Sequence, residues 1–364
     1  MEAVECLANW NARPYVDRVE GMVRQLGDRN PETGDQLLQN NMTLLLNSAG
    51  AKLARLLTQV VLERKLDADS GLFVGWVTAA DQTSEVKAQA LELLSRRRYP
   101  GLRELIRQVW SSSDARLRLT SLPLLATQFP GDFLEIVGSS QSTLSLAEQQ
   151  MVLGLLRTMS EPLAAKRLET YLDLALARQL KPELQLDLLE AVQGRSEPQL
   201  RTKLAAYQAA LPSSGALSRF LPVLVGGDVS RGRELFRTHP NAQCVRCHEA
   251  GGDGYQAGPV LKGIGSKVSR EYLLDALIDP SKRIADGFAT VSLALKDGES
   301  VDGIRTRETA TSLTLRLSSG ETREIRRSDI EKQTSSSVSA MPPMGEVLSL
   351  FELRDLIAFL ASWN

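Results

Sequence analysis

The sequence is poor in the residues that mark several functional classes. Its 364 residues contain only two histidines, three cysteines and 5% aromatic residues. So few histidines disfavour His-based acid–base catalysis, and three cysteines cannot form the disulfide framework of a small secreted domain. The formal net charge is −1, with no basic tract. Because nucleic-acid binding needs clustered Lys and Arg, we expect no nucleic-acid partner.

Long hydrophobic runs are also missing. No apolar stretch approaches the roughly 20 residues that cross a bilayer, so we expect no transmembrane segment in this chain. The first residues, Met1 to Cys6, lack the positive start and apolar core of a secretory signal. Cys6 stands apart from the other cysteines, and the simplest interpretation of a lone cysteine is a small buried apolar side chain.

The first two thirds of the chain are rich in Leu and Ala, which favours helices. A Leu-x-Leu-Leu pattern begins at Leu91, Leu122, Leu153 and Leu186, with spacings of 31, 31 and 33 residues. A period of this size is typical of stacked helix pairs, in which neighbouring repeats share one continuous core. We predict a HEAT-like α-solenoid over residues 1–215, with a plain helical bundle as the alternative.

The pattern changes after a Pro-Ser-Ser-Gly segment at 212–215, and we predict a second domain over residues 226–364. Helices are expected to begin at Asp228 or Ser230, to span Ser269 to Ile278, and to span Phe351 to Trp363. Between the last two, the residues from about 288 to 333 alternate with the period of a strand and include an Asp-Gly hairpin turn. This part is predicted to be a small inserted β-meander or barrel.

Residues 244–248 read C-x-x-C-H, the haem-attachment sequence. Two thiols one turn apart can reach both vinyl groups on one porphyrin edge, and the next residue then brings an imidazole to the iron. We therefore predict one covalent haem c, attached through Cys244 and Cys247, with His248 as an axial ligand. The alternative is a zinc site that adds His239, but adjacent Cys and His seldom ligate the same tetrahedral ion.

Two downstream segments complete the candidate site. A Gly-Pro-x-Leu segment at 258–261 resembles cytochromes c, in which the proline carbonyl accepts a hydrogen bond from the axial histidine. The resemblance implies this role for Pro259. Met341 lies in a Pro-rich loop before the last helix, where cytochromes c usually place their thioether, and is the predicted sixth ligand. Met344 is the alternative, whereas His239 is not expected to reach the opposite haem face.

With these motifs in place, residues 226–364 resemble the haem-binding domain family of the Pirellula/Verrucomicrobium type, found in large exported bacterial proteins. The resemblance is carried by residues 231–236, 244–248, 258–265, 269–274, 279–282, 296–298, 328–330 and 341–342. In that family a HEAT-like region often precedes the cytochrome, and a β-propeller dehydrogenase-like domain can lie further upstream. Haem attachment to C-x-x-C-H generally takes place outside the cytoplasm. We therefore expect a periplasmic or otherwise exported protein, of which this chain is a piece.

These features predict a single-haem electron carrier fused to a helical scaffold. His248 and a methionine thioether would fill both axial positions, leaving outer-sphere exchange between Fe(III) and Fe(II). The repeats are expected to dock a dehydrogenase domain or another redox partner. The chain would then be the electron-transfer module of a larger oxidoreductase and not an enzyme by itself. The alternative is a peroxidase-type haem enzyme with a dissociable sixth ligand, and a structural protein with a vestigial haem also stays open.

Overall fold

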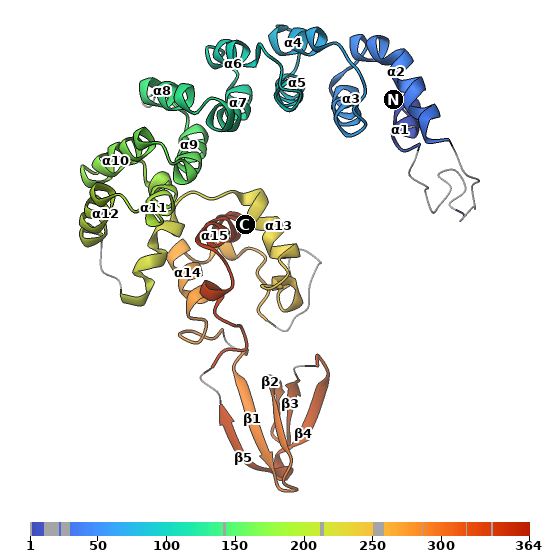
Figure 1. The fold of residues 1–364 in the computed structure, drawn as a ribbon. Helices are drawn as coiled ribbons and strands as arrows, with labels where there is room; N and C mark the ends of the chain where they lie inside the picture. Colours follow the sequence, from blue (N-terminus) through green and yellow to red (C-terminus); the bar gives the residue numbers. More distant parts are fainter. Residues whose placement is uncertain are drawn as a thin grey trace. The chain divides into compact units, whose positions relative to one another are not determined.

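The protein is built mainly from helices. A computed structural model describes residues 2–10, 22, 30–140, 143–211, 215–249, 258–285, 287–317, 319–335 and 338–364. Its contacts form two compact units, Met1–Arg167 and Leu168–Asn364. One open antiparallel sheet lies near the C-terminus (Figure 1). The predicted mainly α class, with β-structure confined to the C-terminal part, is confirmed.

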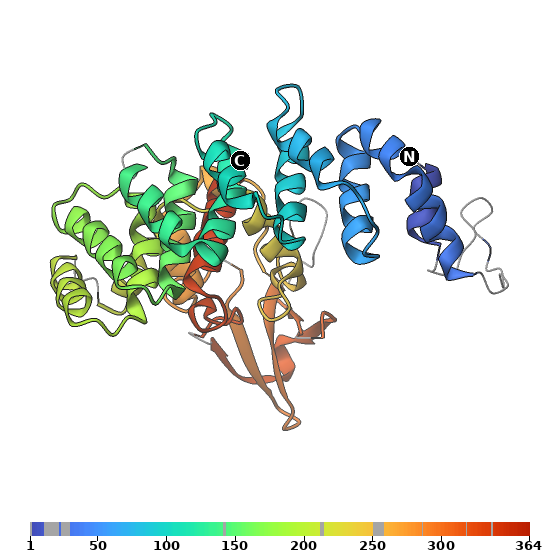
Figure 2. The same cartoon turned by 45° about the horizontal axis from the view of Figure 1, so that its top comes forward.

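The first unit is a succession of helices joined by short turns. They are α1 (Glu2–Ala8), α2 (Pro31–Asn47), α3 (Ala51–Glu63), α4 (Ser70–Thr78), α5 (Ser84–Arg96), α6 (Leu102–Trp110), α7 (Ala115–Gln128), α8 (Pro130–Ser140), α9 (Leu146–Thr158) and the first part of α10 (Pro162–Leu176). Helices α3, α5, α7 and α9 contact one another in turn, whereas α4, α6 and α8 pack against the neighbouring members of that row. Figure 2 shows the same helices, in blue to green, from a second direction. The unit therefore consists of stacked helix pairs.

Side chains at the helix starts explain where these helices begin. Asp69, Thr83, Asp114 and Ser145 are each the residue before a helix, and each side chain accepts a hydrogen bond from a free N–H of the first turn. At Ser145 the bond is reciprocal, because the Glu148 side chain also accepts from the Ser145 backbone N–H. These short polar residues therefore separate consecutive apolar stripes into distinct helices.

Polar contacts in the first unit recur at nearly the same interval as the leucine pattern. Arg103 donates to Asp132 at 2.6 Å across 29 residues, and Arg118 donates to Glu148 at 2.7 Å across 30 residues. The first leucine of each Leu-x-Leu-Leu segment is buried, and Leu91 is fully inaccessible. Each step along the chain thus adds both an apolar layer and a charged hydrogen bond to the preceding step.

The second unit contains the last Leu-x-Leu-Leu segment together with the predicted second domain. Its helical elements are the rest of α10, η1 (Pro182–Leu184), α11 (Gln185–Gln193), α12 (Pro198–Ala210), η2 (Gly215–Leu224), α13 (Val229–Thr238), η3 (Cys244–Arg246), η4 (Ile264–Ser266), α14 (Arg270–Ile278), η5 (Arg327–Asp329), η6 (Met344–Glu346) and α15 (Leu350–Ser362). The helix starts expected at Asp228 and Ser269 are confirmed, since both side chains cap their helices. The last helix is confirmed as well, beginning after Ser349.

Helices α13 and α15 cross at very short range. A Cβ atom added to Gly232 would lie 2.0 Å from the Asp355 carbonyl oxygen, so only glycine fits at this point. Asp355 also accepts hydrogen bonds from the Asp228 backbone N–H at 2.7 Å and from Arg231 at 2.8 Å. Beyond the crossing, the rings of Phe236 and Phe359 pack with centroids 5.8 Å apart. The crossing is thus held by close backbone contact, charge and aromatic packing together.

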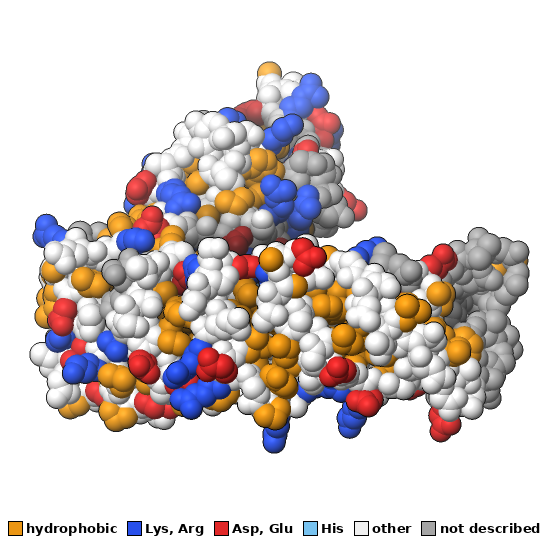
Figure 3. All heavy atoms as spheres, turned by 90° about the horizontal axis from the view of Figure 1, so that it is seen from above, with side chains coloured by type: hydrophobic (Ala, Val, Ile, Leu, Met, Phe, Trp, Pro, Cys, Tyr) orange, Lys and Arg blue, Asp and Glu red, His pale blue; other side chains and the backbone are white. Residues whose placement is uncertain are grey.

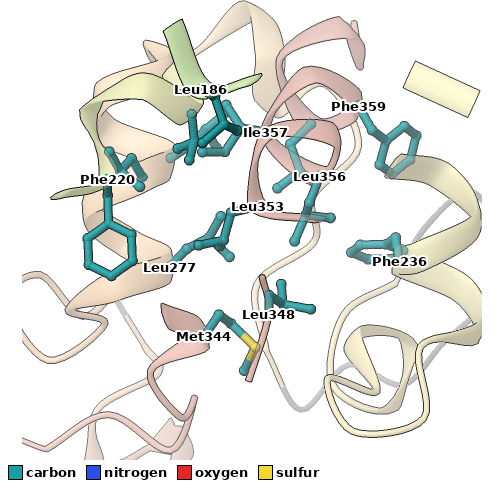
Figure 4. Packing of buried hydrophobic residues seen from close by; sticks show 14 residues of the cluster. Leu186, Phe220, Phe236, Leu277, Met344, Leu348, Leu353, Leu356, Ile357 and Phe359 are labelled. Atoms are coloured by element: carbon teal, nitrogen blue, oxygen red, sulfur yellow. The ribbon is translucent and has the colours of Figure 1, made fainter. Parts of the chain in front are cut away.

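One apolar core surrounds this crossing (Figure 4). Its buried members come from α11, η2, α13, α14, η6, α15 and the turn between η6 and α15. They are Leu186, Phe220, Val223, Phe236, Leu273, Leu274, Leu277, Met344, Leu348, Leu353, Leu356, Ile357, Phe359 and Leu360. Leu186, the start of the last Leu-x-Leu-Leu segment, thus shares a core with α15. Next to it, Asp187 accepts a hydrogen bond from Arg354 at 2.7 Å, and both side chains are almost fully buried.

The sheet is an insertion between α14 and η6. Its strands are β1 (Thr290–Leu295), β2 (Ser300–Glu308), β3 (Ser312–Arg316), β4 (Thr322–Arg326) and β5 (Ile330–Ser335), in the order β4-β3-β2-β1-β5. All neighbours are antiparallel, and Val291, Leu293, Leu313 and Leu315 are among the residues of a separate small core. The sheet is open, with β4 and β5 at its edges, so the barrel form of the prediction is replaced by an open sheet.

Three further expectations concern the surface. Cys6 is exposed, so its interpretation as a buried residue is wrong. Lys and Arg side chains are interspersed with Asp and Glu on the face shown in Figure 3, in keeping with the small net charge. Within the described part of the chain, no helix combines the length and apolar character needed to span a membrane.

The pairing of Asp132 predicts a pH-dependent stability. Hydrogen bonds from Arg103 and then Arg107 lower the pKa of Asp132 to about 2. The carboxylate is therefore favoured in the folded state, and its contribution is complete above the unfolded pKa of about 4 and lost as the pH falls toward 2. We expect Asp132→Asn to cost about 1–2 kcal/mol at pH 7, allowing for the exposed arginines. In denaturant titrations this deficit should vanish near pH 2, whereas Glu92→Gln, an exposed change on α5, should have little effect at any pH.

The crossing at Gly232 predicts a large effect from a single methyl group. Gly232→Ala should lower the free energy of unfolding by about 1–3 kcal/mol or more, because backbone atoms of α15 cannot easily give way. Gly194→Ala is the matched control, since a Cβ at Gly194 meets nothing within 4 Å. Urea unfolding of both variants would check this, and equal stability of the two would contradict the close contact.

Candidate haem site

The C-x-x-C-H segment forms one tight turn after α13. Gln243, just before it, adopts a left-handed backbone conformation with φ 44°, which reverses the chain after the helix. The Cys244 carbonyl then accepts hydrogen bonds from the N–H groups of Cys247 at 3.1 Å and His248 at 2.9 Å. The turn thus brings both cysteines and the histidine together around the Cys244 carbonyl.

The two cysteines of this turn differ in environment. Cys244 is partly buried and packs against the main core, whereas Cys247 is exposed. Burial raises the pKa of the Cys244 thiol to about 11, so this residue carries its proton at neutral pH. No disulfide joins the pair. Both cysteines are therefore free to form thioether bonds with vinyl groups.

His248 is oriented by the chain that follows the motif. Its Nδ1 lies 2.9 Å from the Pro259 carbonyl oxygen, the contact expected from the Gly-Pro-x-Leu segment. Burial lowers the pKa of His248, and the Pro259 contact offsets part of that effect. A neutral imidazole results, in which Nδ1–H donates to Pro259. Nε2 has no hydrogen-bond partner among the described residues, so its lone pair is available to a metal ion.

Gly258 makes room for this imidazole. A Cβ at Gly258 would lie 2.8 Å from Cε1 and 3.0 Å from Nδ1 of His248. The Gly258 N–H also donates to the Cys247 carbonyl at 2.7 Å, so the two chain segments lie directly against each other. From the sequence, a role in orienting His248 was predicted for Pro259 alone. Gly258 is visible in the Gly-Pro-x-Leu segment, but the need for a glycine there follows only from the His248 ring that lies against it.

The two candidate methionines have different surroundings. Met344, at the start of η6, is 3% exposed and lies in the main core beside Leu348 (Figure 4). Met341 is only partly buried and packs against the same core, to which Cys244 and Val245 also contribute. Its backbone N–H donates to Ser339 Oγ at 3.1 Å. Met344 thus lies within the main core, and Met341 lies at its margin. Cys244 and Val245 of the C-x-x-C-H turn pack against the same core.

His239 has a structural role at the end of α13. Its Nδ1 accepts hydrogen bonds from the backbone N–H groups of Asn241 at 3.3 Å and Ala242 at 3.0 Å. Its Nε2 lies 3.5 Å from a carboxylate oxygen of Glu352 on α15. Among the described residues, no group of three or more His, Cys, Asp or Glu side chains is arranged to hold a metal ion. The zinc alternative therefore has no support in the geometry.

The donor set fits a haem c. Two free cysteines on one turn can form the two thioether links, and a neutral imidazole with a fixed ring and an available Nε2 can ligate iron. The close approach at Gly258 keeps that ring in place. Thus the turn holds the cysteines and the histidine at one edge of the main core.

Comparison with known proteins agrees with this geometry. Residues 229–291 match the cytochrome c family. The matched segment begins in α13, includes the C-x-x-C-H turn and α14, and ends in β1. No curated protein matches the chain. Residues 229–291 are therefore a cytochrome c domain, which follows a largely helical region and implies a covalent haem c and haem-based electron transfer.

Proposed function

We propose that this chain is a single-haem electron carrier in which Cys244 and Cys247 attach the haem and His248 is one axial ligand. The observation that carries the proposal is the hydrogen bond from His248 Nδ1 to Pro259, because it leaves Nε2 available in a C-x-x-C-H turn. When bound, the haem supplies one-electron exchange between Fe(III) and Fe(II). The protein's own part is to fix the imidazole, to keep it neutral, and to raise its basicity through the Pro259 carbonyl.

Met341 is the proposed sixth ligand, with Met344 as the alternative. Met344 already fills a place in the core, and moving its thioether would leave a cavity there. Met341 is partly exposed, so its side chain can turn without disrupting the core. A histidine and a thioether would saturate the iron and favour electron transfer over peroxidase-type chemistry.

We further propose that residues 1–215 are a HEAT-like repeat region and that residues 226–364 are the cytochrome domain with its β-insertion. The row of α3, α5, α7 and α9 supports the repeat architecture. The repeats would act as a docking scaffold for a dehydrogenase domain or another redox partner. The domain resembles the Pirellula/Verrucomicrobium type, which favours a periplasmic or otherwise exported location.

Covalent haem attachment tests the central proposal. Made in a host with cytochrome c maturation, the wild-type chain should retain one haem through denaturation, as measured by mass and by haem staining. Cys244→Ala combined with Cys247→Ala should retain none. Cys6→Ala is the matched control and should keep the haem, because the third cysteine lies outside the motif. A wild-type chain without covalent haem would refute the proposal.

Absorption spectra of the same samples test the sixth ligand. Met341→Ala should lose the weak far-red band of a methionine–Fe(III) bond. Met344→Ala should keep this band but lower the free energy of unfolding by about 2–5 kcal/mol, since it empties a core position. The opposite pattern would assign Met344 as the ligand. A high-spin, five-coordinate wild-type spectrum would instead favour the peroxidase-type alternative.

The contact between Gly258 and His248 predicts a shift in reduction potential. Gly258→Ala should displace the ring and weaken its bond to Pro259, making the imidazole a poorer electron donor and raising the potential. The expected rise is roughly 40 mV, the equivalent of one hydrogen bond of about 1 kcal/mol for a one-electron couple. Redox titration measures it, with Val260→Ala as the control because Val260 is 51% exposed. An unchanged potential in Gly258→Ala would contradict the positioning role.

A further inference from the structure

The inserted sheet begins and ends at neighbouring points. Strands β1 and β5 pair with each other, with Val291 opposite Ser335, although 44 residues separate them along the chain. The segment that leaves α14 and the segment that leads to Met341 therefore meet at the same end of the sheet. A contact between these two segments can therefore restrain the loop that carries Met341.

Such a contact is present in a chain of two hydrogen bonds. Ser281, in the segment after α14, accepts a hydrogen bond at its Oγ from the Ser339 backbone N–H at 3.1 Å. The Ser339 hydroxyl in turn accepts from the Met341 backbone N–H at 3.1 Å. The first bond spans 58 residues and the second spans two. Together they connect the start of the insertion to the backbone of the candidate ligand.

The segment that carries Ser281 is itself fixed to the helical core. Asp275 of α14 forms ion pairs with Lys282 at 2.8 Å and Arg283 at 3.2 Å. The Arg283 guanidinium also lies 4.7 Å from the centre of the Tyr272 ring. Helix α14 packs against α15, and Leu273, Leu274 and Leu277 are buried in the main core. Ser281 is therefore held by a rigid element and can hold Ser339 in turn.

We propose that Ser281 and Ser339 are positioning residues for Met341, which hold its loop against the segment that follows α14 so that the thioether stays available to the iron. This inference rests on the proposed assignment of Met341 as the sixth ligand. Holding the loop lowers the entropy that ligation must overcome, so the bond to iron is strengthened without any contact between the serines and the haem. Because Ser281 is exposed, water can replace its hydroxyl, and a several-fold effect is expected.

Competition by imidazole measures this effect. In the haem-loaded full chain, Ser281→Ala and Ser339→Ala should each bind imidazole about fivefold more tightly than wild type, as one lost neutral hydrogen bond predicts. Ser281→Thr retains the hydroxyl and should restore the wild-type affinity. Ser328→Ala, a change in η5 whose hydroxyl donates to Asp329, is the matched control and should behave like wild type. Hydrogen exchange at the Met341 amide should accelerate in both alanine variants, a readout that does not depend on the haem.

The outcomes separate this inference from the proposed function. Unchanged imidazole affinity in Ser281→Ala and Ser339→Ala, with the far-red band lost only in Met341→Ala, would overturn the positioning role and leave the ligand assignment intact. Loss of the band in Met344→Ala alone would overturn both. Equal effects of Ser328→Ala and Ser281→Ala would also overturn the inference, because the change would then be unspecific.

Discussion

Helix α15 determines how the second unit is assembled, and its closest contact is the crossing with α13. At Gly232 the backbones approach so closely that no side chain fits between them. Two consecutive residues of α15 then hold neighbouring elements on different sides: Asp355 binds the start of α13, and Arg354 binds Asp187 of α11. Because adjacent helical residues point about 100° apart, one turn of α15 can join two packing partners.

The position of the candidate site depends on where α13 ends. His239 closes the helix and reaches Glu352 of α15, and the left-handed Gln243 then turns the chain into the C-x-x-C-H segment. The matched cytochrome c segment, residues 229–291, is short for a domain that must hold a large apolar cofactor. Covalent attachment suits this situation, since two thioether bonds retain a cofactor that limited burial could not. Pro259 and Gly258 then need only fix the direction of one imidazole.

The last Leu-x-Leu-Leu segment, which begins in α11, shares a core with the C-terminal helix α15. Leu186 packs with Leu353 and Ile357, and the buried pair of Asp187 and Arg354 makes separation costly, because either partner alone would be an uncompensated buried charge. The predicted domain limits of 1–215 and 226–364 describe the sequence patterns, whereas the contacts divide the chain at Arg167 and Leu168. A docking role for the repeats would therefore involve helices that the cytochrome core itself includes.

Local signals in the sequence determined the helical class, the helix starts at Asp228 and Ser269, the presence of the last helix, and the motif of the candidate site. These features depend on residues close along the chain, such as caps and a C-x-x-C-H turn, so they can be predicted without a fold. Strand β5 has a weaker sequence signal, because it is largely polar and lies at an edge of the sheet. Tertiary structure alone decided the exposure of Cys6, the open sheet, the space that Gly258 leaves for His248, and the bond between Ser281 and Ser339. Each of these depends on segments brought together by packing, which a pattern of neighbouring residues does not encode.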